Sequence, residues 1–179
     1  MSFVRIKTNY GTMVAEIQQD KAPATAANFM RYVQNGTYNN TLFHRVIQNF
    51  MVQGGGLEPG MYSKSNEAPI PNEAANGLKN EKFTLAMART PDPHSATNQF
   101  FINVADNKFL DYTAPTDEGF GYCVFGKLTE GMDIATRISE VPTEERFNYQ
   151  DVPSQDVIIE AIEMIEETDE AAETADSDE

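Results

Sequence analysis

"LFHRVIQNFMVQGGG", residues 42–56, places one arginine in a largely apolar stretch that ends in three glycines. Alternate side chains of a strand share a face, so a strand here would point Arg45 the same way as Phe43 and Ile47. Arginine is almost never fully buried unless it is paired. A permanent positive charge on an apolar wall therefore needs either a partner or a function.

Charge is distributed unevenly along the 179 residues. The formal net charge is −15, and residues 166–179 contain eight acidic and no basic residues, so the remainder carries −7. This acidic end has too few large apolar side chains to offset chain entropy. We expect one domain over residues 1–165 and a disordered acidic tail over 166–179. Nucleic-acid binding is not expected, because it needs clustered Lys and Arg.

The single cysteine, Cys123, excludes an internal disulfide. It lies in the strand-like run "GYCVFG" and is interpreted as a small buried apolar residue. The first residues show no secretory signal, and no apolar run approaches the roughly 20 residues of a membrane helix. We expect a soluble cytoplasmic protein without membrane contact.

Hydrophobic periodicity indicates many short strands and two helices. The expected helices follow Asp20, ending near Gly36, and span residues 130–141. Expected strands are two within 2–18, one over 41–53 bent at Gln48–Asn49, and others at 83–88, 99–105, 121–128 and 156–165. Gly, Pro and Asn predict loops at 54–81 and 89–98. This pattern favours an all-β barrel or sandwich.

No familiar catalytic motif accompanies the arginine. His44, His94 and Cys123 do not form a recognisable metal-ligand spacing, and no nucleophile elbow or phosphate loop is present. Glu73 is an isolated carboxylate, which we interpret as a loop or capping group.

Two structural explanations compete with a functional one for Arg45. The side chain could form a buried ion pair with Glu67 or Glu73. It could also lie at a strand edge with its stem buried and its charged head in water. Composition and spacing leave both explanations open.

Separated motifs in one order point to a family: "FHRVIQNFMVQGG", "LAMAR", "QFFIN", "FLD" and "GYCVFGKLTEGMDI". Together they resemble the cyclophilins, the cyclosporin-binding class of peptidyl-prolyl cis-trans isomerases, and in particular their short cytosolic bacterial members. The resemblance runs from Val4 to Met164. It implies a closed eight-stranded antiparallel barrel with a helix covering each open end.

The resemblance also implies an enzyme that rotates X–Pro bonds of proline-containing polypeptides and assists folding, with no cofactor and no metal. Arg45 matches the main catalytic residue, and Gln53 matches a residue that hydrogen-bonds the substrate and helps orient the arginine. Matches to substrate-binding positions are His44, Phe50, Met51, Ala88, Arg89, Gln99, Phe101, Phe109, Leu110 and Tyr122.

Two positions depart from the family pattern. Many eukaryotic members carry Trp where this chain has Phe109, and His where it has Tyr122. Loss of the indole N–H donor predicts weak cyclosporin binding. No amphipathic element is left over for a dimer interface, so we expect a monomer. The alternative function is a non-catalytic chaperone or adaptor that holds proline-containing segments.

Overall fold

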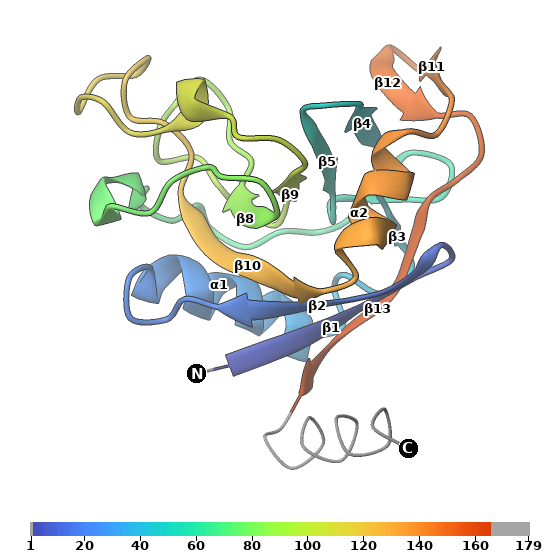
Figure 1. Cartoon of the computed structure of the whole chain (residues 1–179), viewed down its shortest axis with the longest axis horizontal. Helices are drawn as coiled ribbons and strands as arrows, with labels where there is room; N and C mark the ends of the chain where they lie inside the picture. Colours follow the sequence, from blue (N-terminus) through green and yellow to red (C-terminus); the bar gives the residue numbers. More distant parts are fainter. Residues whose placement is uncertain (1, 166–179) are drawn as a thin grey trace.

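The computed structural model describes residues 2–165, and its main feature is one curled antiparallel sheet (Figure 1). In chain order its strands are β1 (Ser2–Thr8), β2 (Gly11–Ile17), β3 (Thr41–Leu42), β4 (Arg45–Ile47), β5 (Met51–Gly54), β8 (Thr84–Met87), β9 (Phe100–Asn103), β10 (Val124–Glu130) and β13 (Ile158–Ile165). Along the sheet the order is β3-β13-β1-β2-β10-β8-β9-β5-β4.

The two end strands of this order, β3 and β4, are separated along the chain only by Phe43 and His44. The backbone N–H of Gly55, directly after β5, donates to the Leu42 carbonyl of β3 (3.3 Å). A Cβ at Gly54 would collide with the main chain of Leu42 and Phe43, so glycine permits this close approach. We call residues 41–47, where the sheet meets itself, the seam.

The predicted mainly-β class with two helices is confirmed. The predicted count of eight strands is wrong, because the seam is split into β3 and β4 and the sheet has nine strands. β3 and β4 pair with different neighbours, β13 and β5. Instead of the predicted closed barrel, the structure has a strongly curled sheet. Its two end strands, β3 and β4, are connected by the short stretch of chain at the seam.

Alternation in β1 shows why these residues form a strand. Val4 and Ile6 are fully buried, whereas Arg5 and Lys7 lie on the outer face and both approach Glu163 of β13 at 3.0 Å. One face thus enters the core while the other is polar, as expected for a half-buried antiparallel strand.

Both helices bury side chains in the same interior cluster, although they lie apart from each other along the sheet (Figure 1). α1 (Pro23–Gln34) has proline in its first turn, and its Phe29 ring lies edge-on to Phe100 of β9, with centroids 5.5 Å apart. α2 (Met132–Ser139) buries Ala135 and Ile138. Since side chains fill the interior, a binding site has to lie on the outer surface.

The predicted bend at Gln48–Asn49 is wrong, because the chain reverses there. β4 and β5 form a hairpin in which Arg45 pairs with Gln53 and Ile47 with Met51. Asn49 has φ +62°, a left-handed conformation that asparagine tolerates better than most residues. The reversal places Arg45 and Gln53 side by side.

Shorter elements surround the sheet. They are β6 (Leu57–Glu58), β7 (Tyr62–Ser63), the 3₁₀ turns η1 (Ala74–Asn76) and η2 (Lys108–Leu110), and the hairpin β11 (Thr143–Arg146) and β12 (Tyr149–Pro153). The sequence patterns did not predict β6–β7 or β11–β12, whereas residues 89–98 form the expected loop. The predicted acidic tail lies outside the described residues. Neither helix between residues 2 and 165 combines the length and apolar character needed to cross a membrane.

Candidate active site

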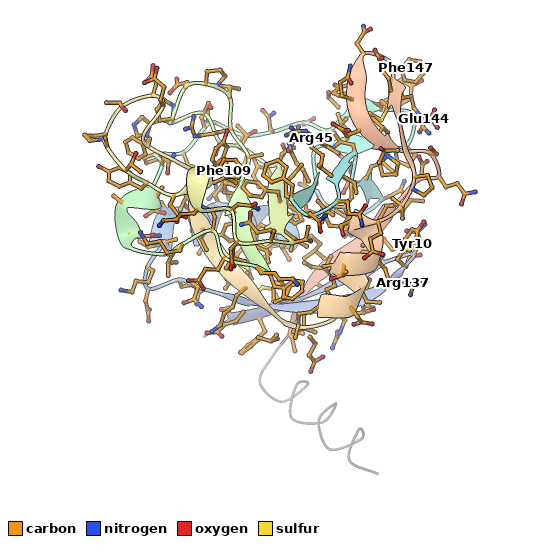
Figure 2. The ribbon with its side chains drawn as sticks, turned by 45° about the horizontal axis from the view of Figure 1, so that its top comes forward. Tyr10, Arg45, Phe109, Arg137, Glu144 and Phe147 are labelled. Carbon is orange, nitrogen blue, oxygen red and sulfur yellow. The ribbon has the colours of Figure 1, made fainter. Side chains whose placement is uncertain are left out.

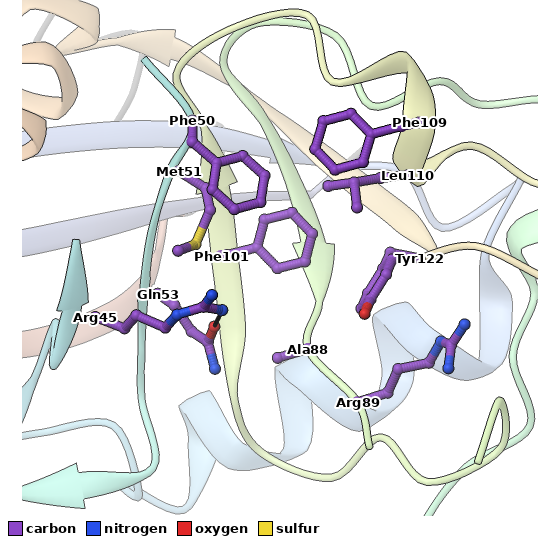
Figure 3. Close-up of a pocket in the computed structure, with 10 residues that line it drawn as sticks. All are labelled: Arg45, Phe50, Met51, Gln53, Ala88, Arg89, Phe101, Phe109, Leu110 and Tyr122. Atoms are coloured by element: carbon purple, nitrogen blue, oxygen red, sulfur yellow. Dashed lines mark hydrogen bonds between the residues drawn. The ribbon is translucent and has the colours of Figure 1, made fainter. Parts of the chain in front are cut away.

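A pocket of about 290 Å³ opens on the outer face of the sheet (Figure 3). Its residues come from β4, β5 and β9 and from the segments that follow β8, follow β9 and precede β10. Figure 2 shows Arg45 and Phe109 on opposite sides of this hollow. The lining residues are Arg45, Phe50, Met51, Gln53, Ala88, Arg89, Phe101, Phe109, Leu110 and Tyr122.

Arg45 is exposed on β4 and faces the pocket. Neither predicted ion-pair partner is available, because Glu67 pairs with Arg31 (3.1 Å) and Glu73 accepts hydrogen bonds from the start of α1. The expectation that Phe43 shares a face with Arg45 is wrong: Phe43 is fully buried in the core. The interruption of the seam at residues 43–44 breaks the alternation on which that expectation depended.

A line of side-chain hydrogen bonds starts at the arginine. Arg45 Nη1 donates to Gln53 Oε1 at 3.4 Å, and Gln53 Nε2 donates to Gln99 Oε1 at 2.9 Å. Gln99 lies outside the pocket, in an adjoining hollow of about 180 Å³. Its oxygen holds the Gln53 amide so that the carbonyl, rather than the NH₂ group, faces the guanidinium.

The floor and walls of the pocket are apolar. Phe101 is 4% exposed and packs with Met51 and Leu110 in one cluster. The Tyr122 ring lies edge-on to Phe101 with centroids 5.7 Å apart. Phe109 is 75% exposed, and its ring lies 5.6 Å from the ring of Phe50. A small apolar ring could therefore pack on an apolar floor close to the Arg45 guanidinium.

Arg89 lines the pocket but directs its donors elsewhere. Its Nε donates to the carbonyl of Gly121 (2.9 Å) and its Nη1 to that of Thr90 (2.9 Å), while its guanidinium lies 4.6 Å from the centre of the Tyr122 ring. These contacts tie two loops together and hold Tyr122 against the pocket. In this geometry Arg89 supports the wall.

His44 does not lie in this pocket, which corrects the expectation that it lines the groove. It is 5% exposed, and its ring contacts Tyr149 of β12 edge-on at 6.0 Å. Burial, and then the charge of the adjacent Arg45, lower the pKa of His44 from 6.5 to about 4. The imidazole is therefore neutral at pH 7.

Other chemistry has little support in the part of the chain that the structure describes. No group of three His, Cys, Asp or Glu side chains there could hold a metal ion. Cys123 is buried, as predicted, and burial raises its pKa to about 11, which disfavours the reactive thiolate. His94 is exposed and accepts a hydrogen bond from the backbone of Asn72.

Residues 3–164 match the family model described as cyclophilin type peptidyl-prolyl cis-trans isomerase/CLD. Peptidyl-prolyl cis-trans isomerase B of Escherichia coli (strain K12) is 54% identical over 163 residues, which cover 91% of this chain and 99% of that protein. Peptidyl-prolyl cis-trans isomerase cyp18 of Streptomyces antibioticus is 53% identical over 165 residues, with 92% and 99% covered. The chain belongs to the cyclophilin-type peptidyl-prolyl cis-trans isomerases.

A solved structure supports the same assignment. It is a cyclophilin type peptidyl-prolyl cis-trans isomerase of Cryptosporidium parvum, crystallised in the presence of the dipeptide Ala-Pro. The two folds agree with a TM-score of 0.78 at 29% identity, covering 92% of this chain and 99% of that chain. The predicted family and enzyme class are thus confirmed.

All ten residues that line the pocket were named by the family resemblance, although their individual roles stay predictions. The resemblance named two further site residues: Gln99 lies in the adjoining hollow, and His44 is buried elsewhere. The sequence patterns alone missed the buried amides beside the pocket, because a single asparagine is typical of any turn.

Proposed function

We propose that Arg45 catalyses X–Pro isomerisation by donating a hydrogen bond to the prolyl nitrogen when the peptide bond is half rotated. The barrier of about 20 kcal/mol arises from C–N double-bond character. In the twisted state the nitrogen lone pair is no longer delocalised and becomes a better acceptor. A donor held at that nitrogen stabilises the transition state more than either planar isomer.

An arginine suits this role because its guanidinium stays protonated and presents rigid donors. Its stem lies along β4 beside Gln53, whose carbonyl accepts one guanidinium N–H at 3.4 Å. Only one donor is engaged in this contact, so others remain to meet a substrate. We propose that Gln53 orients the arginine and that Gln99 in turn orients Gln53.

The apolar part of the pocket is the proposed seat of the proline ring. Phe101 would form its floor, with Met51 and Leu110 beside it and Phe50 and Phe109 at the rim. Holding the ring still while the acyl side turns is the positioning that the reaction needs. The related Cryptosporidium structure was determined in the presence of the dipeptide Ala-Pro, which contains an X–Pro bond of the kind proposed as substrate here.

The proposed partners are exposed proline-containing segments of other polypeptides. The pocket has a floor the size of one ring and an open rim. It would therefore select proline and leave the neighbouring side chains of the substrate largely free, which favours broad specificity. A monomer is proposed from the sequence, in which no amphipathic element is left over for a dimer interface. A cytoplasmic location stays a prediction from the sequence.

An Arg45→Ala variant tests the mechanism. We expect kcat/KM for an Ala-Pro peptide to fall about 100-fold, since loss of a preorganised charged donor costs about 3 kcal/mol in the transition state. NMR exchange spectroscopy measures turnover, and circular dichroism checks that the variant is folded.

Arg31→Ala is the matched control, because it removes an exposed arginine of α1 that pairs with Glu67. It should leave turnover unchanged. A folded Arg45→Ala variant with wild-type turnover would exclude the mechanism. If that variant is inactive but still suppresses aggregation of a client without cis-proline, the alternative of a holding chaperone gains support instead.

A further inference from the structure

Three asparagines are buried beside the pocket. Asn80, Asn103 and Asn107 are 2%, 0% and 3% exposed, and they come from the segment before β8, the end of β9 and the residue before η2. Burying an amide is unfavourable unless its polar atoms are hydrogen-bonded. Three amides in one place, bonded to each other, therefore call for an explanation beyond packing.

Asn103 is the centre of this network. Its Nδ2 donates to Asn80 Oδ1 (3.1 Å) and to Thr84 Oγ1 (2.9 Å), and its Oδ1 accepts from Asn107 Nδ2 (2.7 Å). In the pairing of β5 with β9, Asn103 lies opposite Met51, a pocket residue. Opposed side chains of an antiparallel pair share a face, so Asn103 lies on the pocket side of the sheet.

The outer ends of the network reach the main chain of pocket residues. Asn107 Nδ2 donates to the carbonyl of Phe50 (2.9 Å). Asn80 Nδ2 donates to the carbonyls of Leu110 (3.1 Å) and Tyr122 (3.2 Å). Figure 3 shows Phe50 on one side of the Phe101 floor and Leu110 and Tyr122 on the other.

We infer that Asn80, Asn103 and Asn107 are positioning residues that fix the distance between the two walls of the pocket. The inference rests on the proposed function of that pocket. The bonds to Phe50, Leu110 and Tyr122 end on main-chain carbonyl groups, so they locate the backbone of each wall whatever its side chain does, and Asn80 Nδ2 also donates to Asp111 Oδ1 (3.2 Å). Amides suit this role because each offers two donors and an acceptor and carries no charge to desolvate.

The expected consequence concerns alignment more than affinity. Apolar contact with the proline ring is non-directional and survives a small shift of one wall. The hydrogen bond from Arg45 to the prolyl nitrogen is directional, and small misplacements of reacting groups reduce rates strongly. Loosening the network should therefore lower kcat more than it weakens peptide binding.

The test compares Asn103→Ala with Thr84→Val. Asn103→Ala removes the side-chain link between Asn80 and Asn107, which are then joined by the backbone hydrogen bond from the Asn107 N–H to the Asn80 carbonyl (2.8 Å). Thr84→Val removes the acceptor of Asn103 that leads away from the pocket. NMR exchange spectroscopy on an Ala-Pro peptide gives turnover, and titration gives Kd. We expect Asn103→Ala to lower kcat about tenfold or more with Kd changed less than about threefold, and Thr84→Val to leave both near wild type.

Asn107→Ala provides a second variant should Asn103→Ala fail to fold, because Phe50 keeps its hydrogen bond from Val104 (3.0 Å). Asn107→Ala should also lower kcat. Wild-type kcat in the folded variants, or an equal fall in Thr84→Val, would overturn the positioning role. A wild-type protein without turnover would overturn the proposed function itself.

Discussion

Neighbouring residues 44 and 45 show how strongly position decides the state of a basic side chain. Arg45 is exposed on the pocket side of β4, whereas His44 is 5% exposed and packs against Tyr149. The charge of Arg45 disfavours a second charge next to it and adds to the effect of burial on His44. The enzyme thus has a permanent cation in its pocket and a neutral imidazole behind it.

This arrangement predicts acid sensitivity of the fold. Unfolded His44 takes up a proton near pH 6.5, whereas folded His44 resists protonation down to about pH 4. The unfolded state binds more protons in that interval, so the free energy of unfolding decreases as the pH falls through it. The loss approaches about 3 kcal/mol at pH 4. Urea titrations between pH 7 and pH 4.5 measure most of it.

Variants assign the effect to one residue. His44→Gln should flatten the pH dependence over this interval, whereas His94→Gln, which removes the exposed histidine, should preserve it. An unchanged slope in His44→Gln would show that another group titrates.

Phe109 is expected to limit the affinity for cyclosporin. It is 75% exposed at the rim of the pocket and lacks the indole N–H of the tryptophan that the resemblance gives for many eukaryotic members. Phe109→Trp should tighten cyclosporin binding about three- to tenfold, because one net hydrogen bond contributes about 1 kcal/mol. The chain has no tryptophan, so the new indole fluorescence reports binding directly. Phe147→Trp, exposed on the β11–β12 hairpin, should leave the affinity unchanged.

At the scale of elements, the β4–β5 hairpin was the hardest feature to predict and the most important for the site. Val46 and Val52 are both buried, and the apolar residues on either side of the polar pair Gln48–Asn49 fit one bent strand as well as two paired strands, so periodicity could not distinguish a bend from a reversal. The pocket residues were found by family resemblance, because their apolar side chains look like any core residue.

The β11–β12 hairpin was missed for a different reason. Its first strand, "TEER", is polar and mostly exposed, so it has no hydrophobic alternation. Pairing with β12 and contact between Tyr149 and His44 hold it in place. The helices and the strands β1, β2, β8, β9, β10 and β13 contain buried apolar residues, and these are the elements that the sequence pattern predicted.

Glu73, which the sequence led us to interpret as a loop or capping group, caps α1. No side chain at Ala22 caps α1, and Glu73 supplies the acceptors from a distant loop: Oε1 for the Thr25 N–H (2.7 Å) and Oε2 for the Ala24 N–H (3.3 Å). Glu73→Ala should reduce stability by about 1–2 kcal/mol, as loss of an N-cap does. Thermal unfolding should show a midpoint lower by about 5 °C.

The exposed carboxylate of Glu81 provides the matched control. Glu81→Ala should change the midpoint by less than about 2 °C, as expected for most surface substitutions. Glu73→Gln keeps an acceptor oxygen but loses the charge, and should fall between the two. Equal stability of Glu73→Ala and Glu81→Ala would contradict the capping role.

At the scale of the whole molecule, the acidic excess is concentrated outside the described residues. Truncation after Ile165 removes eight acidic residues and leaves a net charge of −7. Since the sheet, both helices and the pocket lie within residues 2–165, we expect the truncated protein to keep its melting temperature and its turnover of a neutral Ala-Pro peptide. Calorimetry and NMR exchange measure the two quantities. A lower melting temperature would show that residues 166–179 contribute to the fold.

The seam carries a consequence for how this enzyme fails. Residues 41–47 join the two ends of the sheet and also place the Arg45 guanidinium at the pocket. Proteins open locally before they unfold globally. Local opening at the seam would displace the proposed catalytic group. If the proposed role of Arg45 holds, the molecule cannot open at these seven residues and remain active.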